Sequence, residues 1–379
     1  MKEQNQLGNI ELYRSKRKKQ TQMHRFIVVL VVLGIGLLLV LGYYGVTKLS
    51  ISSEEGGGNF PVKLSGDLIL QNEMMGSQTV ILTDKELLFY NKQGNLLRKI
   101  SHGDFSPAIS CSSDKVLLYD MGGVNFRVES SSGTLLTKSS SNDIIMGKIA
   151  ENGNIVIVSE DDRYSCRLTV YDKNGDEIFK WYLADNYITA FDFVDSGDGC
   201  VVAAVGVSDG FTTTTVYGLD FSKEKEQYQS TITGSLPVAV NVMDNRTQVV
   251  CDNQLVLLDK NGSQLHAVPF TQSLKQVVAA SDYYTVLLFG EEVKSTSTMV
   301  VYDANASVVG SSSSSERIRR IDSDGKHVTA LYDDKIICYD MSLEQTRELD
   351  HQESVNDVIC GGSSGYSVNT TTLNRFALE

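Results

Sequence analysis

Residues 361–365, GGSSG, match the G-x-S-x-G pattern of a nucleophile elbow, the turn that presents a catalytic serine in some hydrolases. That chemistry needs a strained turn between a strand and a helix, an oxyanion hole and a histidine that follows the serine in the chain. Here a strand-like run, YSVNTTT, follows the motif, and the last histidine of the chain is His351. We therefore predict a hairpin turn at residues 361–365 rather than a serine nucleophile.

Two short acidic stretches resemble fragments of calcium-binding loops: DSGDG at residues 195–199 and DSDG at residues 322–325. A cation loop needs several oxygen ligands and usually a bidentate carboxylate further along, and neither stretch completes that set. The five histidines are isolated from one another, without the H-x-x-x-H or H-E-x-x-H spacing of a zinc site. The sequence therefore predicts no catalytic, metal-ligating or cofactor-binding residue, and no cofactor.

The six cysteines are scattered and form no C-x-x-C pair, so zinc-ribbon and thioredoxin signatures are excluded. Cys166 alternates with Leu168 and Val170, a register typical of small buried core residues. An extracellular location would permit disulfides, so the redox state stays open. The cysteines are Cys111, Cys166, Cys200, Cys251, Cys338 and Cys360.

The elements that carry these residues repeat along the chain. Residues 170–183, VYDKNGDEIFKWYL, read as strand, turn and strand, and the Asn174-Gly175 pair suits the positive φ of a tight turn. Equivalent positions recur at a mean spacing of about 41 residues. These positions are Tyr90, Glu129, Tyr171, Leu219, Leu258, Tyr302, Tyr339 and Phe376.

This repeat predicts an all-β fold, a β-propeller of eight four-stranded blades, preceded by one transmembrane α-helix. Four short strands per unit of about 40 residues are the signature of a propeller blade. An immunoglobulin-like sandwich lacks such self-similarity, and a helical solenoid would show helical periodicity. Seven blades are the alternative, if the weak copy at Glu129 is an insertion within a larger blade.

Ring closure is expected between the two ends of the propeller. The sequence given ends at Glu379, directly after the third strand of the eighth unit, so that unit lacks its outermost strand. The segment Phe60–Leu70 has no partner within its own blade. Because an open ring would expose unpaired strand edges, we predict that part of it, between Val62 and Leu70, pairs with Leu373–Leu378.

The unit VYDKNGDEIFKWYL resembles the quinoprotein-type propeller repeat, in which an Asp-x-x-x-Gly turn follows an apolar strand and a tryptophan docks neighbouring blades. The resemblance implies that Trp181, the only tryptophan of the chain, lies between two blades. It also implies that Gly94, Gly175 and Gly262 are structural glycines of the turns. The docking tryptophan is missing from every other unit.

An apolar run precedes the propeller. Phe26–Val46 contains 21 residues without a charge, which at 1.5 Å per residue is about the ~30 Å thickness of a bilayer core. A leader of 25 residues precedes it and no small-x-small cleavage site follows it, so we interpret it as an uncleaved signal anchor. The expected divisions are a basic leader at 1–25, a span at 26–46, a flexible linker at 47–59 and the propeller at 60–379.

The flanks of this run predict its orientation. Residues 1–25 carry seven Lys and Arg against two Glu. The positive-inside rule then places the N-terminus in the cytoplasm and the propeller outside the cell, with an aromatic anchor at the outer interface. The residues assigned to this topology signal are Arg14, Lys16, Arg17, Lys18, Lys19, Tyr43 and Tyr44.

Charge restricts the partners. Residues 26–379 carry 27 Lys and Arg against 45 Asp and Glu, a net charge of −18. Such a surface repels nucleic acid and favours solubility and cationic partners. We therefore expect the lipid bilayer as a partner through residues 26–46, protein partners at the cell surface, and no nucleic acid.

The layout as a whole is similar to an uncharacterised family of single-pass membrane proteins from Gram-positive Firmicutes, which implies no established activity. We expect a membrane-tethered extracellular propeller that acts as a protein-binding or scaffold module, and more readily so than an enzyme. One alternative is an enzyme that acts on an extracellular substrate such as a glycan. Another is an extracellular sensor, although a leader of 25 residues is too short for a catalytic domain.

Overall fold

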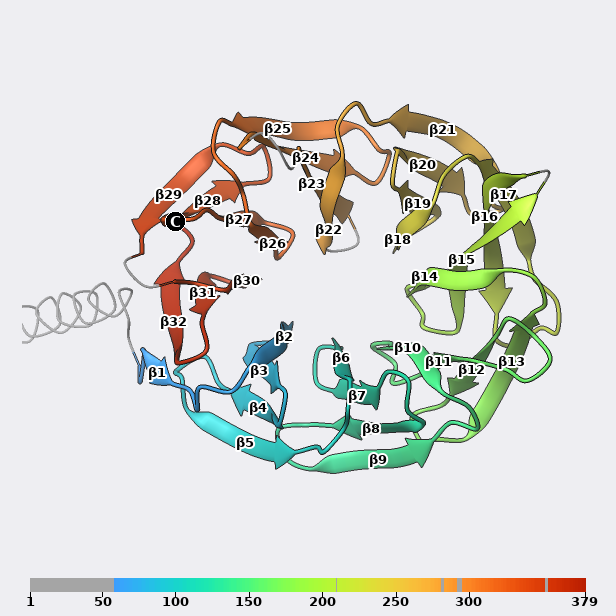
Figure 1. The fold of residues 1–379 in the computed structure, drawn as a ribbon, viewed down its shortest axis with the longest axis horizontal. Helices are drawn as coiled ribbons and strands as arrows, with labels where there is room; N and C mark the ends of the chain where they lie inside the picture. Colours follow the sequence, from blue (N-terminus) through green and yellow to red (C-terminus); the bar gives the residue numbers. More distant parts are fainter. Residues whose placement is uncertain (1–57, 209, 281–282, 292–294, 352–353) are drawn as a thin grey trace, which may run out of the picture. The chain divides into compact units, whose positions relative to one another are not determined.

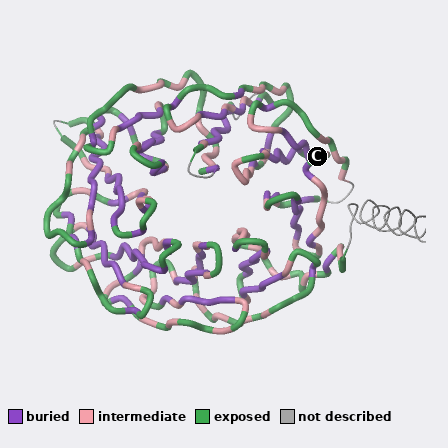
Figure 2. Tube along the Cα trace, turned by 180° about the vertical axis from the view of Figure 1, so that it is seen from behind, coloured by how far each residue is buried: buried purple, intermediate pink, exposed green. Residues whose placement is uncertain are grey.

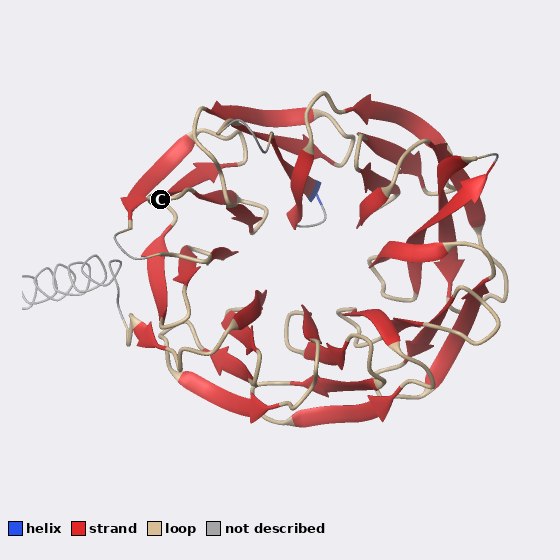
Figure 3. Cartoon of the chain, in the orientation of Figure 1, coloured by secondary structure: helices blue, strands red, loops and turns tan. Residues whose placement is uncertain are grey.

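The computed structural model describes residues 58–379, apart from residues 209, 281–282, 292–294 and 352–353. These residues form a ring of eight four-stranded antiparallel sheets, which confirms the eight-bladed propeller (Figure 1). Nearly all of the regular structure in the ring is strand (Figure 3). Within the part of the chain so described, no helix is long and apolar enough to cross a membrane. The predicted leader, the span at 26–46 and the anchor tyrosines lie outside it.

Blades are numbered here in chain order. Blades 1 to 4 consist of β2 (Ile69–Met75), β3 (Gln78–Thr83), β4 (Glu86–Tyr90) and β5 (Leu96–Ser101); β6 (Pro107–Cys111), β7 (Val116–Asp120), β8 (Asn125–Glu129) and β9 (Thr134–Ser139); β10 (Ile144–Ile149), β11 (Ile155–Ser159), β12 (Cys166–Tyr171) and β13 (Glu177–Leu183); and β14 (Tyr187–Phe193), β15 (Gly199–Ser208), β16 (Phe211–Asp220) and β17 (Tyr228–Thr233).

Blades 5 to 8 follow the same order, except that β1 supplies the last strand of blade 8. They consist of β18 (Pro237–Met243), β19 (Arg246–Cys251), β20 (Gln254–Asp259) and β21 (Gln264–Pro269); β22 (Leu274–Ala280), β23 (Tyr284–Gly290), β24 (Ser297–Asp303) and β25 (Val308–Ser314); β26 (Arg320–Ser323), β27 (His327–Leu331), β28 (Lys335–Asp340) and β29 (Gln345–Asp350); and β30 (Asp357–Gly361), β31 (Ser364–Val368), β32 (Thr372–Ala377) and β1 (Val62–Lys63).

Burial differs between the strands of one blade. The middle strands, such as β11 and β12, are buried along their whole length because each lies between two neighbouring blades. The outermost strands, such as β5 and β29, have a solvent-facing side and alternate between exposed and half-buried residues. Figure 2 shows this distribution, with buried residues concentrated within the ring wall. The wholly apolar and the alternating runs of the sequence therefore correspond to middle and outer strands.

Two-residue pairing closes the ring, as predicted. Val62 lies opposite Leu373 and Lys63 opposite Thr372, so β1 completes blade 8 beside β32. The predicted pairing segment, Val62 to Leu70, was too long, because the residues from Ile69 onward form β2, the first strand of blade 1. Leu68 lies between the two strands and is 59% exposed.

The weak copy at Glu129 belongs to a regular blade, so the seven-blade alternative is wrong. The other units have a tyrosine, leucine or phenylalanine at this position, whereas Glu129 places a fully buried carboxylate there. Arg98 Nη1 lies 2.9 Å from one carboxylate oxygen and Arg127 Nε lies 3.6 Å from the other, and the Thr134 hydroxyl donates to the group at 2.8 Å. Two arginines thus compensate the buried charge where blades 1 and 2 meet.

A repeated turn joins the third and fourth strands of most blades. In blade 3 the carboxylate of Asp172 accepts the backbone N–H of Asn174 at 2.9 Å and of Asp176 at 2.8 Å, and Gly175 has φ +84°. A Cβ at Gly175 would lie 2.6 Å from Leu136 Cδ1 of blade 2, so the glycine also permits the close approach of two blades. Equivalent turns contain Gly94, Gly262, Ala306 and Leu343, all with positive φ.

Candidate functional site

The innermost strands of the blades surround the centre of the ring (Figure 1). Side chains link several neighbouring pairs of these strands. The Gln71 amide donates to the Ile109 carbonyl and accepts the Ile109 N–H, both at 3.0 Å. Gln276 makes the same pair of bonds with Ile321, at 2.7 and 3.0 Å. Each bond replaces a backbone partner that the edge of an inner strand lacks, and so holds adjacent blades in register.

Carboxylates serve the same purpose at the junction of blades 1 and 2 and at two other junctions. Glu73 accepts the backbone N–H of Cys111 at 2.9 Å, and Asp322 accepts that of Cys360 at 2.7 Å. Asp357 accepts the amide of Asn72 at 3.1 Å, across the junction between blades 8 and 1. These carboxylates are therefore hydrogen-bonded parts of the ring.

A central cavity of about 460 Å³ lies between the inner strands of blades 1, 7 and 8, where these carboxylates meet. Burial raises the pKa of Asp322 to about 7, and the neighbouring carboxylates of Asp357 and Asp324 add to the shift. Burial also raises the pKa of Glu73 and holds that of the Cys360 thiol well above its usual range. The cavity can exchange a proton near neutral pH, but its thiol is kept in the unreactive protonated form.

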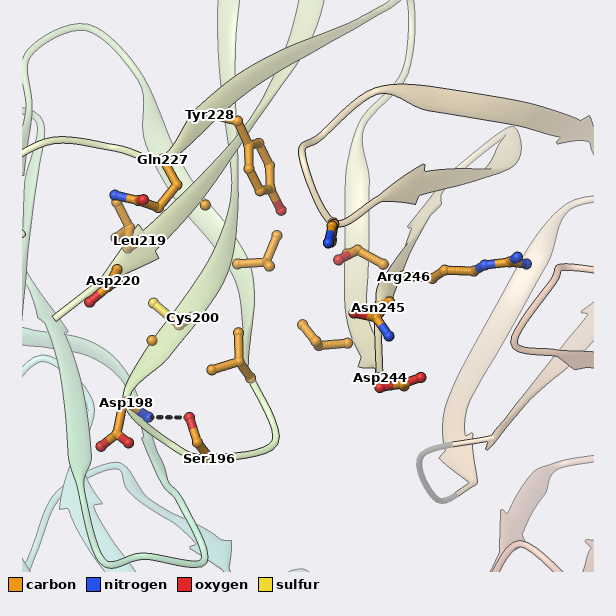
Figure 4. Close-up of a pocket in the computed structure, with 17 residues that line it drawn as sticks. Ser196, Asp198, Cys200, Leu219, Asp220, Gln227, Tyr228, Asp244, Asn245 and Arg246 are labelled. Carbon is orange, nitrogen blue, oxygen red and sulfur yellow. Dashed lines mark hydrogen bonds between the residues drawn. The ribbon is translucent and has the colours of Figure 1, made fainter.

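A second cavity, of about 280 Å³, opens between blades 4 and 5 (Figure 4). Hydrogen bonds from Ser222, with nearby Lys223, hold the pKa of Asp220 down at about 2, so this carboxylate is a permanent anion. Arg246 and Lys260 supply cationic groups, whereas Cys200 is fully buried in the wall. Three carboxylates, of Asp198, Asp220 and Asp244, and two cations line this cavity, and its thiol is buried.

The two faces of the ring can be told apart by the connections that lie on each. In an antiparallel four-stranded blade, connections between blades and between the second and third strands lie on one face, which we call the loop face. The connections between the first and second strands and between the third and fourth strands lie on the opposite face, which we call the turn face. Backbone bonds confirm this grouping: Ser165, before β12, donates to the Leu183 carbonyl at the end of β13 at 2.8 Å.

Large exposed apolar side chains gather on the loop face. They are Leu68, Leu70, Phe105, Met121, Tyr164, Tyr182, Tyr187, Val207, Phe211, Leu236 and Val238. The other members of this class lie at the turn-face end of the blades: Tyr283 in a turn, and Leu96, Leu97, Leu135, Ile178, Leu265, Val308 and Val309 at the starts of the outermost strands of five blades. The exposed aromatic side chains are more unevenly distributed, because five of the six among the described residues lie on the loop face and Tyr283 lies on the turn face. Contiguous exposed apolar surface on a soluble domain marks interaction sites.

The part of this set over blades 2 to 4 forms a continuous series of loops, which we call the crescent. It comprises Phe105, Met121, Tyr164, Tyr182, Tyr187, Val207 and Phe211. Met121 forms a backbone bridge with Ile144, and the rings of Tyr164 and Tyr182 pack at 5.0 Å between centroids. The Cys166 thiol contacts the Asn186 carbonyl at 3.7 Å, which links this pair to the loop before Tyr187.

The far end of the crescent is a projecting hairpin. β15 and β16 have ten residues each and pair from Gly199–Asp220 to Ser208–Phe211, so their hairpin is longer than the others. Near its tip Val207 is 77% and Phe211 64% exposed. Phe105, at the opposite end, is 98% exposed. These side chains have little native packing to explain their apolar character.

The structure places the predicted structural residues away from the crescent's surface. Trp181 is 7% exposed, packs edge-on against Tyr217 of blade 4 at 4.8 Å and donates from Nε1 to Glu226 at 2.6 Å. Gly94, Gly175 and Gly262 lie in the turns, and the segment 361–365 is a hairpin turn between β30 and β31, as predicted.

Sequence reasoning missed the crescent. One available signal was the longest interval of the repeat, between Tyr171 and Leu219, because the extra residues lengthen the β15–β16 hairpin. Another was the run EDDRY at 160–164, which puts a tyrosine into an otherwise charged loop. Among the residues that the structure describes, no group of His, Cys, Asp or Glu is arranged to hold a metal ion.

Comparison with known proteins supports the fold. A family model described as "Family of unknown function (DUF5711)" matches residues 65–375. The sequence matches no curated protein. The computationally designed Ika8 protein is similar in structure, with a TM-score of 0.63 at 16% identity over 84% of this chain and 98% of that one.

Two natural propellers are similar at comparable levels. The C-terminal WD40 domain of Sif2 has a TM-score of 0.62 at 12% identity, covering 84% of this chain and 97% of its own. BamB from Moraxella catarrhalis has a TM-score of 0.56 at 9% identity, covering 83% and 98%. At such identities the likeness shows the β-propeller fold alone, a fold that often serves protein interaction.

Proposed function

The chain belongs to the DUF5711 family of unknown function, and from that premise we propose that it is a membrane-tethered scaffold that binds protein partners at the surface of a Firmicute cell. The single observation that carries the binding role is the asymmetry of the ring. Of the six exposed aromatic side chains among the described residues, five lie on the loop face and one, Tyr283, lies on the turn face. A rigid disc with one such face is suited to docking another protein.

The membrane and surface parts of the proposal rest on the sequence. The apolar run 26–46, with the basic residues before it, is the support for a span whose N-terminus lies in the cytoplasm. A linker containing Gly56, Gly57 and Gly58 then leads to the propeller. In this arrangement residues 26–46 contact the bilayer, and the propeller meets its partners outside the cell.

Topology is tested first, on the full chain in intact cells or protoplasts. Added protease should remove or shift the part after Val46 and leave the leader protected. Digestion of the propeller only after lysis would overturn the surface location.

Binding is tested by crosslinking in intact cells with two matched variants. Phe211→Ser removes an exposed aromatic side chain of the loop face, and Tyr283→Ser removes one of the turn face. We expect the same crosslinked partner to be lost with Phe211→Ser and retained with Tyr283→Ser. Equal yields of that partner from both variants would refute the loop face as the binding surface.

A further inference from the structure

The crescent combines its apolar side chains with exposed negative charge. Asp143, Glu160, Asp162 and Asp185 are all exposed. Glu160 and Asp162 lie in the loop of Tyr164, Asp185 lies between Tyr182 and Tyr187, and Asp143 lies in the adjoining loop, where its carbonyl accepts the Glu160 N–H at 2.9 Å. The side chains of Asp143, Glu160 and Asp185 make no ion pair or hydrogen bond within the described residues. Four exposed carboxylates therefore lie in the loops around three aromatic rings.

The neighbouring arginines change this balance little. Arg167 is buried and engaged by Asp161 at 3.6 Å and by Ser159 at 3.3 Å, so it serves the blade rather than the surface. Arg163 is exposed in the same loop as Glu160 and is outnumbered by the acids around it. The surface of the crescent is thus both apolar and anionic.

Charge complementarity selects the occupant. An anionic lipid surface carries the same sign as the crescent and is repelled by it. A segment with Lys or Arg interleaved with apolar residues would neutralise the carboxylates, place cations over the tyrosine faces and cover the apolar side chains. Because the aromatic groups stand on paired strands and hydrogen-bonded loops, little conformational entropy is lost when they are covered.

We propose that the crescent is the docking site for a basic, apolar-containing segment of a protein partner. This inference rests on the proposed function, since it specifies the chemistry of the partner that the loop face binds. Self-association is the competing occupant, because the loop face also has a cavity of about 550 Å³ between blades 6 and 7, lined by Arg317, Arg319 and Arg320. That cavity could receive the acidic crescent of a second copy.

The test uses the full chain in lipid nanodiscs and a synthetic peptide of alternating Arg and Leu as the probe. The triple variant Glu160→Gln, Asp162→Asn, Asp185→Asn should weaken peptide binding about tenfold at low salt, as expected for the loss of three exposed charge pairs. The matched control is a turn-face triple of exposed acids, Asp176→Asn, Glu224→Gln, Asp244→Asn, which removes the same charge and should bind as the wild type does.

Equal weakening by both triples would mean that net charge alone attracts the peptide, and would overturn the inference. Sedimentation of the wild type that shows dimers, dispersed by the crescent triple, would overturn it in favour of a second copy. Cellular crosslinking then separates this inference from the proposed function. A partner lost with Phe211→Ser but retained with the crescent triple leaves the proposed function intact and refutes the basic partner.

Discussion

The two faces of the ring differ in how far their side chains are engaged within the protein. On the turn face, an aspartate such as Asp172 accepts two backbone N–H groups of its own turn, and Gly175 packs against the neighbouring blade. On the loop face, Tyr187 and Phe211 are 58% and 64% exposed. The turn face is thus built for internal stability, whereas the loop face leaves apolar surface for something else to cover.

The largest effect on stability is expected where blade 3 joins blade 4. Trp181→Ala should lower the free energy of unfolding by ~3–5 kcal/mol, because a buried indole loses its contact with Tyr217 and its bond to Glu226. Urea denaturation followed by far-UV circular dichroism measures it. Trp181→Phe is the control that keeps most of the packing, and a change below ~0.5 kcal/mol in Trp181→Ala would place the residue at a surface instead.

The junction of blades 7 and 8 belongs to neither face and should respond to pH. The pKa of Asp322 is about 7 in the fold and its ordinary value is 3.8, so the folded state holds the proton more tightly than the unfolded chain does. Wild-type stability should therefore fall as pH rises from about 4 to about 7, by roughly 3 kcal/mol.

Asp322→Asn tests this expectation, because its amide oxygen can still accept the Cys360 N–H without ionising. Its thermal midpoint should vary less than that of the wild type between pH 5 and pH 8, conditions chosen to span most of this transition. Parallel pH profiles for the two proteins would contradict the role assigned to this carboxylate.

On the turn face, substitutions at positions with positive φ should have a smaller effect on the free energy of unfolding, and its direction can be predicted. Gly175→Ala should cost ~1–3 kcal/mol, because alanine disfavours φ +84° and its Cβ would meet Leu136. The equivalent turn of blade 6 has Ala306 at φ +56°, so Ala306→Gly tests the same conformation in reverse. We expect a gain of up to about 1 kcal/mol there, offset in part by lost packing, and both thermal midpoints falling together would contradict the shared-turn explanation.

The smallest effect on stability is expected from the crescent. Phe211→Ser should change the free energy of unfolding by less than ~0.5 kcal/mol, since the ring is largely exposed. Together with the loss of partner crosslinking, this result would sharpen the contrast between the two faces. A large loss of stability would show instead that the β15–β16 hairpin needs this side chain for folding.

The repeat could be predicted because the strands of each blade have a recognisable hydrophobic pattern within a short stretch of sequence. Apolar middle strands and alternating outer strands recur at each unit, and ring closure followed from a missing strand partner. The links between inner strands could not be predicted from one sequence, since Gln71 and Ile109 are 38 residues apart and the polar side chain of Gln71, which binds the Ile109 backbone, looks like that of an ordinary surface residue. Their separation is close to the repeat length, and that is the signal which would have found them.

The crescent was harder to predict for a different reason. A tyrosine in a loop, such as Tyr164, is exposed or buried according to how the neighbouring loops fold over it, and sequence periodicity carries no such information. Glu129 illustrates the converse case, because its burial depends on Arg98 from another blade. Membrane insertion and the roles of Arg14 to Lys19 stay predictions.

The two-residue seam of blade 8 also sets the order of events during synthesis. Val62 is translated more than 300 residues before its partner Leu373, so β1 has no partner until Leu373 has been synthesised. Until then blades 1 and 8 cannot pack against each other, and the nascent ring is an open arc. Its two ends expose apolar surface and unpaired strand edges. Non-local pairing of this kind slows folding. A cell that makes this protein must therefore shield the arc for the whole of its elongation, and a ribosome stalled before residue 372 would release a product that cannot close.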